Sequence, residues 1–338
     1  MQDQTPLVSI IMAAKDTAPY IAECLESIMA QSYSNWELIA VNDHSDDATP
    51  QILADYARRD SRIRYFDSDS PKLIPTLQFA YARCNGDLIN RMDSDDRMPS
   101  YKLEVMVNEW LKYGSGHVIA GGTQHFVDEG EVGGGFRRYE DWLNDVARNG
   151  RHLEEIYTEC VIPSHSWLLH KGDMDRVGAF DSDIYPEDYD LCFRFYKHQL
   201  KIIGIDYVLH YWRDRGDRIS RTWDVYKDNR YFQLKLDNFF ELDRDESRPL
   251  VLWGAGRNGK DMAKLLQQKG KVFHWVCDSE SKIGKDIYGV KMHHYDAIVQ
   301  MRRPQIIIVV SSPNGKIEIK KQLEDMGKSV VEDYWFFA

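Results

Sequence analysis

The 338-residue sequence is poor in cysteine, in basic charge and in long apolar segments, and each shortage excludes a class of protein. Its five cysteines are scattered, odd in number and never in a Cys-X-X-Cys pair, which argues against a disulfide framework and a structural zinc site. Lysine and arginine total 43 against 54 acidic residues, so we expect no general nucleic-acid surface. No segment reaches the roughly 18 apolar residues of a membrane-spanning helix. We expect a cytoplasmic protein, with peripheral contact at the inner face of the membrane left open.

Length and composition predict two folded domains. The chain is longer than most single domains, and 43% hydrophobic residues suffice to build a core in each of two. Residues 243–248 are charged and contain no apolar side chain, which predicts a linker. We therefore expect a first domain over residues 1–242, ending in a long aromatic-rich helix over 223–242, and a second domain over 249–338.

The first hundred residues alternate between apolar runs and amphipathic helical patterns. Apolar runs of strand length occur at residues 7–12 and 36–41, and such runs are typical of strands buried on both faces. Residues 62–66 and 87–92 are predicted to form a third and a fourth strand. Helical patterns separate the runs. The alternation predicts an α/β fold with a doubly wound, mostly parallel sheet, in which ligands bind beyond the carboxyl ends of the strands.

Two later stretches extend this first domain. The glycine-rich residues 130–135 predict a mobile surface loop, and a lid over a bound ligand is the alternative. The apolar runs at 201–205 and 207–212 predict two further strands.

Acidic residues follow three of the predicted strands, as Asp16, Asp43 and the group Asp93, Asp95 and Asp96. Unpaired carboxylates repel each other by about 4 kcal/mol per pair at roughly 4 Å and an effective dielectric of about 20, so the group needs a cation. All-oxygen ligands select Mg²⁺ or Mn²⁺ over zinc. A solvated acidic turn is the alternative for an isolated group. Three acidic strand ends at one edge favour a site for a nucleotide and a metal ion.

These segments, in this order, resemble the family 2 glycosyltransferases of the GT-A fold over roughly residues 5–222. The resemblance rests on the opening strand 8–16, on residues 37–47, which are similar to the family's "IVVDDGSTD" segment, and on Asp93-Ser94-Asp95-Asp96, which is similar to its DxD-containing "DSDD". It implies that Asp95 binds the metal bridging the donor diphosphate and that Asp93 contacts the ribose or the metal.

The second acidic strand end departs from the family pattern. The resemblance implies that Asp43 contacts the base of the donor and that Asp16 lies on the donor side. However, the first aspartate of the family's pair is replaced by Asn42 and its glycine by His44. Both departures concern the loop that contacts the base, so they leave the choice of nucleotide open.

A second group of acidic residues, Tyr185-Pro186-Glu187-Asp188-Tyr189-Asp190, begins a predicted helix. The helix dipole favours carboxylates in a first turn, so capping is the alternative for Glu187 and Asp190. The resemblance implies that Asp188 is the general base that takes the proton from the acceptor hydroxyl, with Glu187 and His165 on the acceptor side. For His165, the alternative is a structural hydrogen-bonding histidine.

A basic segment, Arg213 to Ser220, follows the last predicted strand of this domain. The family often has an R-x-H sequence here, and the position of its histidine is taken by Arg215, which removes a third protein ligand for the metal. A guanidinium at this position can instead neutralise the departing diphosphate. A solvated basic loop is the alternative.

The C-terminal domain has its own nucleotide-binding pattern. A strand over 249–253 leads into a G-x-G-x-x-G sequence, formed by Gly254, Gly256 and Gly259, and Asp278 follows the next strand at about the spacing of a ribose-binding acid. These features predict a small Rossmann-like domain, which looks like the nucleotide-binding modules fused to some bacterial sugar-modifying enzymes. With half of a dinucleotide fold and no evident hydride-transfer residues, we favour a mononucleotide-binding, regulatory or assembly module over a dehydrogenase.

The leading functional hypothesis is a metal-dependent glycosyltransferase with inversion, as the resemblance implies. It would move a sugar from a nucleoside diphosphate sugar, with UDP favoured, to a hydroxyl of a bacterial surface glycan or a lipid-linked glycan. A sugar nucleotidyltransferase is one alternative, although residues 13–19 contain none of the glycines that its basic loop normally has. An oxidoreductase or nucleotide-sensing protein that depends on residues 249–338 is another.

Overall fold

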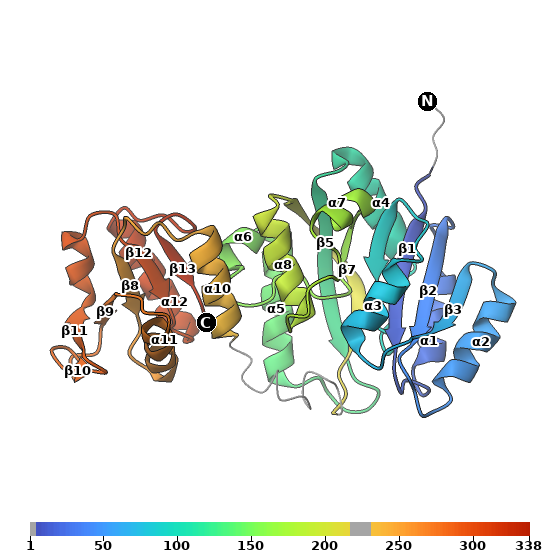
Figure 1. Ribbon diagram of the computed structural model, residues 1–338, viewed down its shortest axis with the longest axis horizontal. Coiled ribbons are helices and arrows are strands. Elements are labelled where there is room, and N and C mark those ends of the chain that lie inside the picture. The colour runs from blue at the N-terminus through green and yellow to red at the C-terminus, as the bar shows by residue number, and fades with distance from the viewer. Residues whose placement is uncertain (1–4, 217–230) are drawn as a thin grey trace. The chain divides into compact units, whose positions relative to one another are not determined.

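A computed structural model describes residues 5–216 and 231–338, which form two compact α/β units (Figure 1). Of the described residues, 5–152 and 161–216 belong to the first unit, and 153–160 and 231–338 to the second. The units differ from the predicted domains, because helix α10 (Phe232–Leu242) groups with the C-terminal residues. The part of the predicted helix 223–242 that precedes residue 231 lies outside the described residues.

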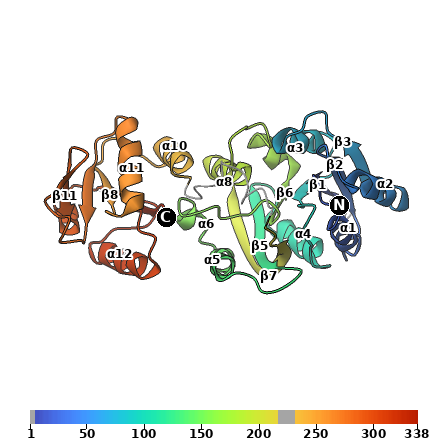
Figure 2. The same cartoon turned by 90° about the horizontal axis from the view of Figure 1, so that it is seen from below.

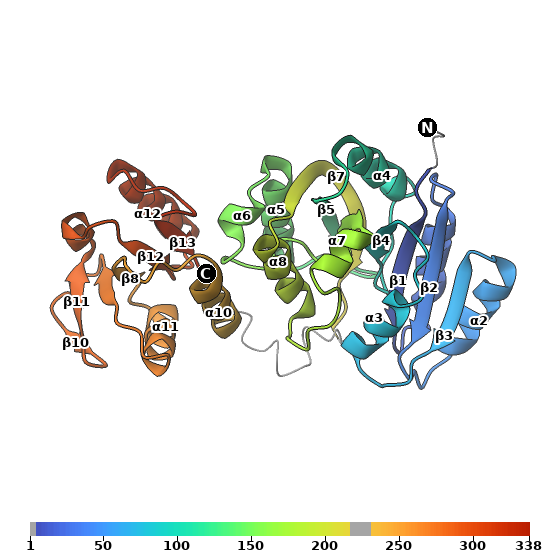
Figure 3. The same cartoon turned by 45° about the horizontal axis from the view of Figure 1, so that its top comes forward.

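The first unit is built on a seven-stranded sheet with the order β3-β2-β1-β4-β6-β5-β7 among its described residues. The strands β1 to β4 pair in parallel, as predicted, whereas β6 runs antiparallel to both of its neighbours. The last strand is single rather than the two predicted, and Figure 3 shows it as a long curved ribbon beside β5. The strands are β1 (Val8–Ala14), β2 (Trp36–Asn42), β3 (Ile63–Asp67), β4 (Leu88–Arg91), β5 (His117–Phe126), β6 (Trp167–His170) and β7 (Lys201–Arg213).

Helices cover both faces of this sheet. Alternate residues of β1, among them Val8, Ile10 and Met12, share a core with the apolar sides of α1, α2 and α4. Helix α3 packs on the other face, against β1 and β2 (Figure 2). The inner strands β1, β2 and β4 are therefore buried on both faces, whereas β3 at the edge of the sheet is only partly buried. The helices are α1 (Ile21–Met29), α2 (Thr49–Arg59), α3 (Leu73–Tyr81), α4 (Lys102–Tyr113), α5 (Gly134–Asn149), α7 (Lys171–Arg176) and α8 (Glu187–Lys197).

The glycine-rich loop predicted over residues 130–135 is partly helical, because α5 begins at Gly134. Its two leading glycines are poor helix formers, which hid the start of the helix in the sequence. The helix is stabilised further along, where Leu143, Val146 and Ala147 are buried at a helical spacing. Packing against β5 and β7 thus outweighs the weak local propensity.

The second unit contains a six-stranded sheet with the order β10-β11-β9-β8-β12-β13. All of its pairs except β10 with β11 are parallel. In chain order the five parallel strands run 3-2-1-4-5 across the sheet, an order that doubly wound nucleotide folds use. Helices α11 and α12 lie on opposite faces (Figure 2). The elements are β8 (Leu250–Trp253), α11 (Arg257–Gln268), β9 (His274–Cys277), β10 (Asp286–Ile287), β11 (Val290–His294), η2 (Tyr295–Gln300), β12 (Gln305–Ile308), α12 (Pro313–Asp325) and β13 (Tyr334–Phe336).

A segment from the middle of the chain completes the core of this second unit. Residues 153–160, which include most of helix α6 (His152–Glu155), pack against α10 and the C-terminus. The ring of Tyr157 stacks on Phe337 with centroids 4.9 Å apart, and its hydroxyl donates a hydrogen bond to Asp243. The buried ammonium of Lys235 donates to the carbonyl oxygens of Thr158 and Phe337. In neither described range is there a helix long and apolar enough to cross a membrane.

Candidate active site

The three carboxylates of the acidic loop after β4, those of Asp93, Asp95 and Asp96, contact different partners. Asp93 accepts hydrogen bonds from the guanidinium of Arg91 at 3.1 Å and from the hydroxyl of Ser164 at 2.9 Å. Burial by itself would raise the pKa of Asp93, but Arg91 and the imidazole of His165 hold it well below its usual value. Asp93 is therefore ionised at neutral pH, as a residue that binds a cation must be.

Asp95 lies against the basic segment that follows β7. The Nε of Arg215 donates to its carboxylate at 2.9 Å, and both side chains are largely buried. The backbone carbonyl of Asp95 accepts from the Nε of Arg213 at 2.7 Å. Arg213 also pairs with Glu23 and Asp128, so it ties the acidic loop to α1 and to the end of β5. Arg213 thus holds the backbone of the acidic loop, and Arg215 balances the charge of the Asp95 carboxylate.

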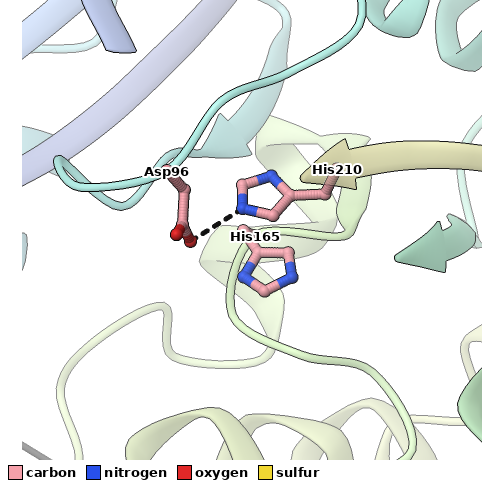
Figure 4. Close-up of side chains that lie close together, drawn as sticks. All are labelled: Asp96, His165 and His210. Carbon is pink, nitrogen blue, oxygen red and sulfur yellow. Dashed lines mark hydrogen bonds and ion pairs between the residues drawn. The ribbon is translucent and has the colours of Figure 1, made fainter. Parts of the chain in front are cut away.

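Asp96 points inward and is almost completely buried (Figure 4). Its carboxylate accepts from the Nε2 of His210 at 2.8 Å and from the backbone nitrogen of Arg213 at 2.7 Å. The ring of His210 stacks on that of His165 with centroids 3.5 Å apart and planes 12° from parallel. His165, which the sequence predicts on the acceptor side, is fully buried.

Asp96, His165 and His210 form a group that could hold a metal ion, since one ligand atom from each lies within 4.8 Å of the others. The lone pairs of imidazole nitrogens lie in the ring planes, and two stacked, nearly parallel planes do not meet at a common point. One ring would have to turn before both histidines could bind the same ion. In its present form the group is a support for the acidic loop.

A buried lysine from α4 contacts one of the two stacked histidines. Lys102, at the start of α4, is fully buried and donates to the backbone carbonyl of His165 at 2.8 Å. Burial lowers its pKa to about 7, although the carboxylates of Asp93 and Asp96 act in the opposite direction. The sequence does not single out Lys102 or His210, because neither belongs to a recognisable motif, and it shows Arg213 only as the first residue of the basic segment.

The second acidic group lies at the start of α8, where Asp188 has an unusual protonation equilibrium. Burial, reinforced by the neighbouring Glu187, raises the pKa of Asp188 to about 7 against the effect of Arg91. Glu187 pairs with Arg91 at 2.9 Å. A single guanidinium therefore joins Asp93 of the acidic loop to the residue beside Asp188. A carboxyl group that titrates near neutral pH is suited to general base catalysis.

The loops after β1 and β2 contain two more predicted residues, Asp16 and Asp43. Asp43 is buried, burial raises its pKa, and its Oδ1 has no hydrogen-bond partner among the residues that the structure describes. Asp16 accepts a hydrogen bond from the backbone nitrogen of Asp46 at 2.8 Å and so braces the loop after β2. Asn42 donates to Asp67 at 2.9 Å, and His44 has a φ of 54°, a conformation that favours glycine. The Oδ1 of Asp43 is thus a buried acceptor that a ligand could use.

The glycine sequence of the second unit connects β8 to α11. Gly254 has a φ of 133°, and a Cβ at Gly259 would lie 2.0 Å from the carbonyl oxygen of Gly254. Gly256 precedes the first residue of the helix and has open space where a Cβ would stand. Asp278 follows β9 and is exposed. These four residues lie at the carboxyl ends of neighbouring parallel strands, where doubly wound folds bind ligands.

Comparison with known proteins identifies a protein family that the first unit matches. The family model described as Glycosyl transferase family 2 matches residues 9–178, half of the chain. The putative glycosyltransferase EpsE of Bacillus subtilis is 28% identical over 293 residues, covering 80% of this chain and 98% of EpsE. The matched part of the chain spans 32% of one other curated relative and 59% of another.

Two solved structures have the same fold. TarS 1–349 of S. aureus in complex with UDP-GlcNAc has a TM-score of 0.52 and 17% identity, covering 71% of this chain and 68% of that one. The mannosyltransferase PcManGT of Pyrobaculum calidifontis, in complex with GDP-Man and Mn²⁺, has a TM-score of 0.54 and 17% identity over 72% and 66% of the two chains. At this identity the likeness concerns the fold alone.

Proposed function

The chain belongs to glycosyl transferase family 2, and from that membership we propose that this glycosyltransferase uses a nucleoside diphosphate sugar, with UDP favoured, as its donor. The acceptor would be a hydroxyl of a bacterial surface glycan or a lipid-linked glycan, reached from the cytoplasm. The observation that carries the proposal is the bridge made by Arg91, which contacts both Asp93 and Glu187. It brings a donor-binding carboxylate and a base with a near-neutral pKa into one site.

The donor half of the site would be formed by the three strand ends. The unpartnered Oδ1 of Asp43 is suited to accept a hydrogen bond from an N–H of the base. Asp95, with Asp93, would hold Mn²⁺ or Mg²⁺, since hard divalent ions prefer carboxylate oxygens. Such an ion would stabilise the negative charge of the departing diphosphate. Arg215 would contribute positive charge on the same side.

The acceptor half would depend on Asp188. Its carboxylate would take the proton of the acceptor hydroxyl as that oxygen forms its bond to the anomeric carbon. The bond from that carbon to the diphosphate oxygen would break, and the nucleoside diphosphate would leave with the electron pair. Attack opposite the leaving group gives a single displacement with inversion. A base of this kind contributes about 10²- to 10⁴-fold to the rate.

A donor screen tests this proposal. The melting temperature of the full chain would be measured with UDP-, GDP- and dTDP-sugars, each with and without Mn²⁺. We expect the largest rise with a UDP-sugar and Mn²⁺ together, because ligands that bind the native state stabilise it. Asp43→Asn should weaken the response to every nucleotide. An unchanged melting temperature with all donors would contradict the proposed donor class.

The second unit supports a separate proposal, because its strand order and its close glycine turn match those of nucleotide-binding folds. We propose that it binds a mononucleotide and serves regulation or assembly. An oxidoreductase activity remains the alternative, and nicotinamide fluorescence on the full chain would reveal it. A sugar nucleotidyltransferase has no support in the family match, which names a glycosyltransferase.

A further inference from the structure

We propose that Arg215 is a built-in counter-cation of Asp95, which must leave this carboxylate before a divalent ion can bind there. The inference rests on the proposed function and concerns how metal and donor bind to that same site. It makes Arg215 a residue that weakens the binding of metal alone and couples it to the binding of a nucleoside diphosphate.

The guanidinium of Arg215 is bonded to one oxygen of the Asp95 carboxylate, which a metal ion at Asp95 would also need. The Nε of Arg215 lies 2.9 Å from the Oδ2 of Asp95, a hydrogen bond between opposite charges. The guanidinium also lies over the ring of Tyr20, 5.2 Å from its centroid, which favours a cation at this position. With side chains only 19% and 15% exposed, the pair is poorly screened by solvent. A second cation on the same carboxylate would be repelled.

Arg91 and Arg215, which both pair with carboxylates of the acidic loop, differ in how firmly they are held. Arg91 has a side chain 7% exposed and is shared between Asp93 and Glu187, so its departure would leave two carboxylates without their cation. Arg215 is more exposed and follows the last residue of β7 by two positions. Arg213 holds the backbone of Asp95 independently, so the loop keeps its position when Arg215 moves. Arg215 is therefore the displaceable cation.

A nucleoside diphosphate gives the released guanidinium a new partner. Arginine binds phosphate oxygens by two parallel hydrogen bonds, which compensate for the loss of the hydrogen bond to Asp95. A metal ion alone offers no such compensation, because it leaves Arg215 beside a neutralised carboxylate. Metal and diphosphate should therefore bind with positive coupling, and by linkage each should raise the affinity for the other equally.

The test is a Mn²⁺ titration followed by the electron paramagnetic resonance signal of the free ion, with and without UDP. For the full chain carrying Arg215→Ala we expect Mn²⁺ alone to bind about tenfold more tightly than to the wild type, within the range of roughly 5- to 150-fold usual for coupled sites. UDP should tighten Mn²⁺ binding strongly in the wild type and much less in the variant. Arg215→Gln should behave in the same way and serves if the alanine variant does not fold.

Two further variants distinguish an error in the proposed role of Arg215 from an error in the proposed metal site. Arg97→Ala removes an arginine two positions from Asp95 whose guanidinium pairs with Glu23 at 2.7 Å, so it controls for a general loss of positive charge. It should leave Mn²⁺ affinity within about twofold of the wild type, far below the tenfold effect expected from coupling. Asp95→Asn should abolish binding, and unchanged binding there would refute the proposed metal site itself. If Asp95→Asn loses Mn²⁺ while both Arg215 variants bind it no more tightly than the wild type, this inference alone is wrong. Absence of Mn²⁺ binding in all proteins, with or without UDP, would overturn both.

Discussion

Asp188 is the residue at which activity and stability are expected to oppose each other, because its ionised form is needed for proton transfer and is disfavoured by burial. Its pKa is raised to about 7 by burial and by Glu187. Asp188→Asn should lower kcat by about 10²- to 10⁴-fold and leave donor binding unchanged. The same variant should melt roughly 2–5 °C higher, since it removes a buried charge. Transfer assays and thermal melts measure both effects.

A neighbouring carboxylate provides the matched control for this prediction. Asp190 lies in the same helical turn, but it pairs with Arg194 at 2.8 Å, so its charge is compensated. Asp190→Asn should lower the melting temperature and leave kcat within a few fold of the wild type. Wild-type turnover by Asp188→Asn would remove the assignment of the base.

The pH dependence of stability should show a minimum near neutral pH in the metal-free chain, because two buried groups titrate there in opposite senses. For Asp188 the folded pKa of about 7 exceeds its usual 3.8, so its stabilising contribution is full below about pH 4 and is lost as pH rises through 7. For Lys102 the folded pKa of about 7 lies below its usual 10.5, so stability rises with pH between these values. Thermal melts from pH 5 to 9 would follow both effects.

Single substitutions show which residue causes the fall in stability below pH 7 and which causes the rise above it. Asp188→Asn should flatten the fall below pH 7, and Lys102→Met should flatten the rise above it. A profile that keeps both limbs in these variants would show that other groups cause them. Activity should rise through pH 7 in the wild type, because the base must lose its proton first.

At the scale of elements, the stacked imidazoles join β7 and the segment before β6 to the acidic loop. His210→Ala would remove the imidazole that donates a hydrogen bond to the buried carboxylate of Asp96, at a cost of about 1–3 kcal/mol of unfolding free energy. Because the loop then loses its support, we expect the KM for the donor to rise as well. Denaturant melts and donor kinetics measure the two effects.

The exposed His198 at the end of α8 supplies the control for that variant. His198→Ala should alter neither stability nor the KM. If His210→Ala loses stability and keeps the wild-type KM, the stacked pair is structural support without influence on donor binding.

The turn between β8 and α11 allows the fold and the proposed nucleotide site of the second unit to be tested separately. Gly259→Ala places a methyl group against the carbonyl of Gly254, so it should destabilise the unit by about 1–3 kcal/mol. Gly256→Ala meets open space and has an ordinary φ of −76°, so stability should be unchanged. Loss of nucleotide binding by Gly256→Ala, measured by calorimetry, would support a phosphate at this turn. Equal binding by Gly256→Ala and the wild type would contradict it.

At the scale of the whole molecule, the chain is not a simple succession of two domains. Residues 153–160 interrupt the first unit and pack in the second, where Tyr157 contacts Phe239 and Phe337. A fragment of residues 249–338 lacks both this segment and α10. We expect it to melt without cooperativity and to bind a hydrophobic dye, as measured by circular dichroism and fluorescence. A cooperative melt of that fragment would show that the predicted boundary at 249 delimits an independent domain.

Sequence patterns were sufficient for the local features of the fold. The apolar runs at 7–12 and 36–41 became the parallel strands β1 and β2, because a strand buried on both faces is apolar along its length. Local patterns did not predict the start of α5, which begins with glycines, or the single long strand β7, whose pairing with β5 contains a bulge. Both elements depend on packing against each other and on β5, which no local pattern records.

In the candidate site, too, some features follow from the sequence and others from the tertiary structure. By itself, the sequence determined which acidic residues stand at the strand ends and at the start of α8, because motif and strand lie next to each other in the chain. Only the tertiary structure decided what each carboxylate does, since Asp95 meets Arg215 and Asp96 meets His210 across more than a hundred residues. Charge, burial and pKa are set by such partners. The roles of Asp93, Asp95 and Asp96, identical in type, therefore differ through the side chains that the fold brings to them.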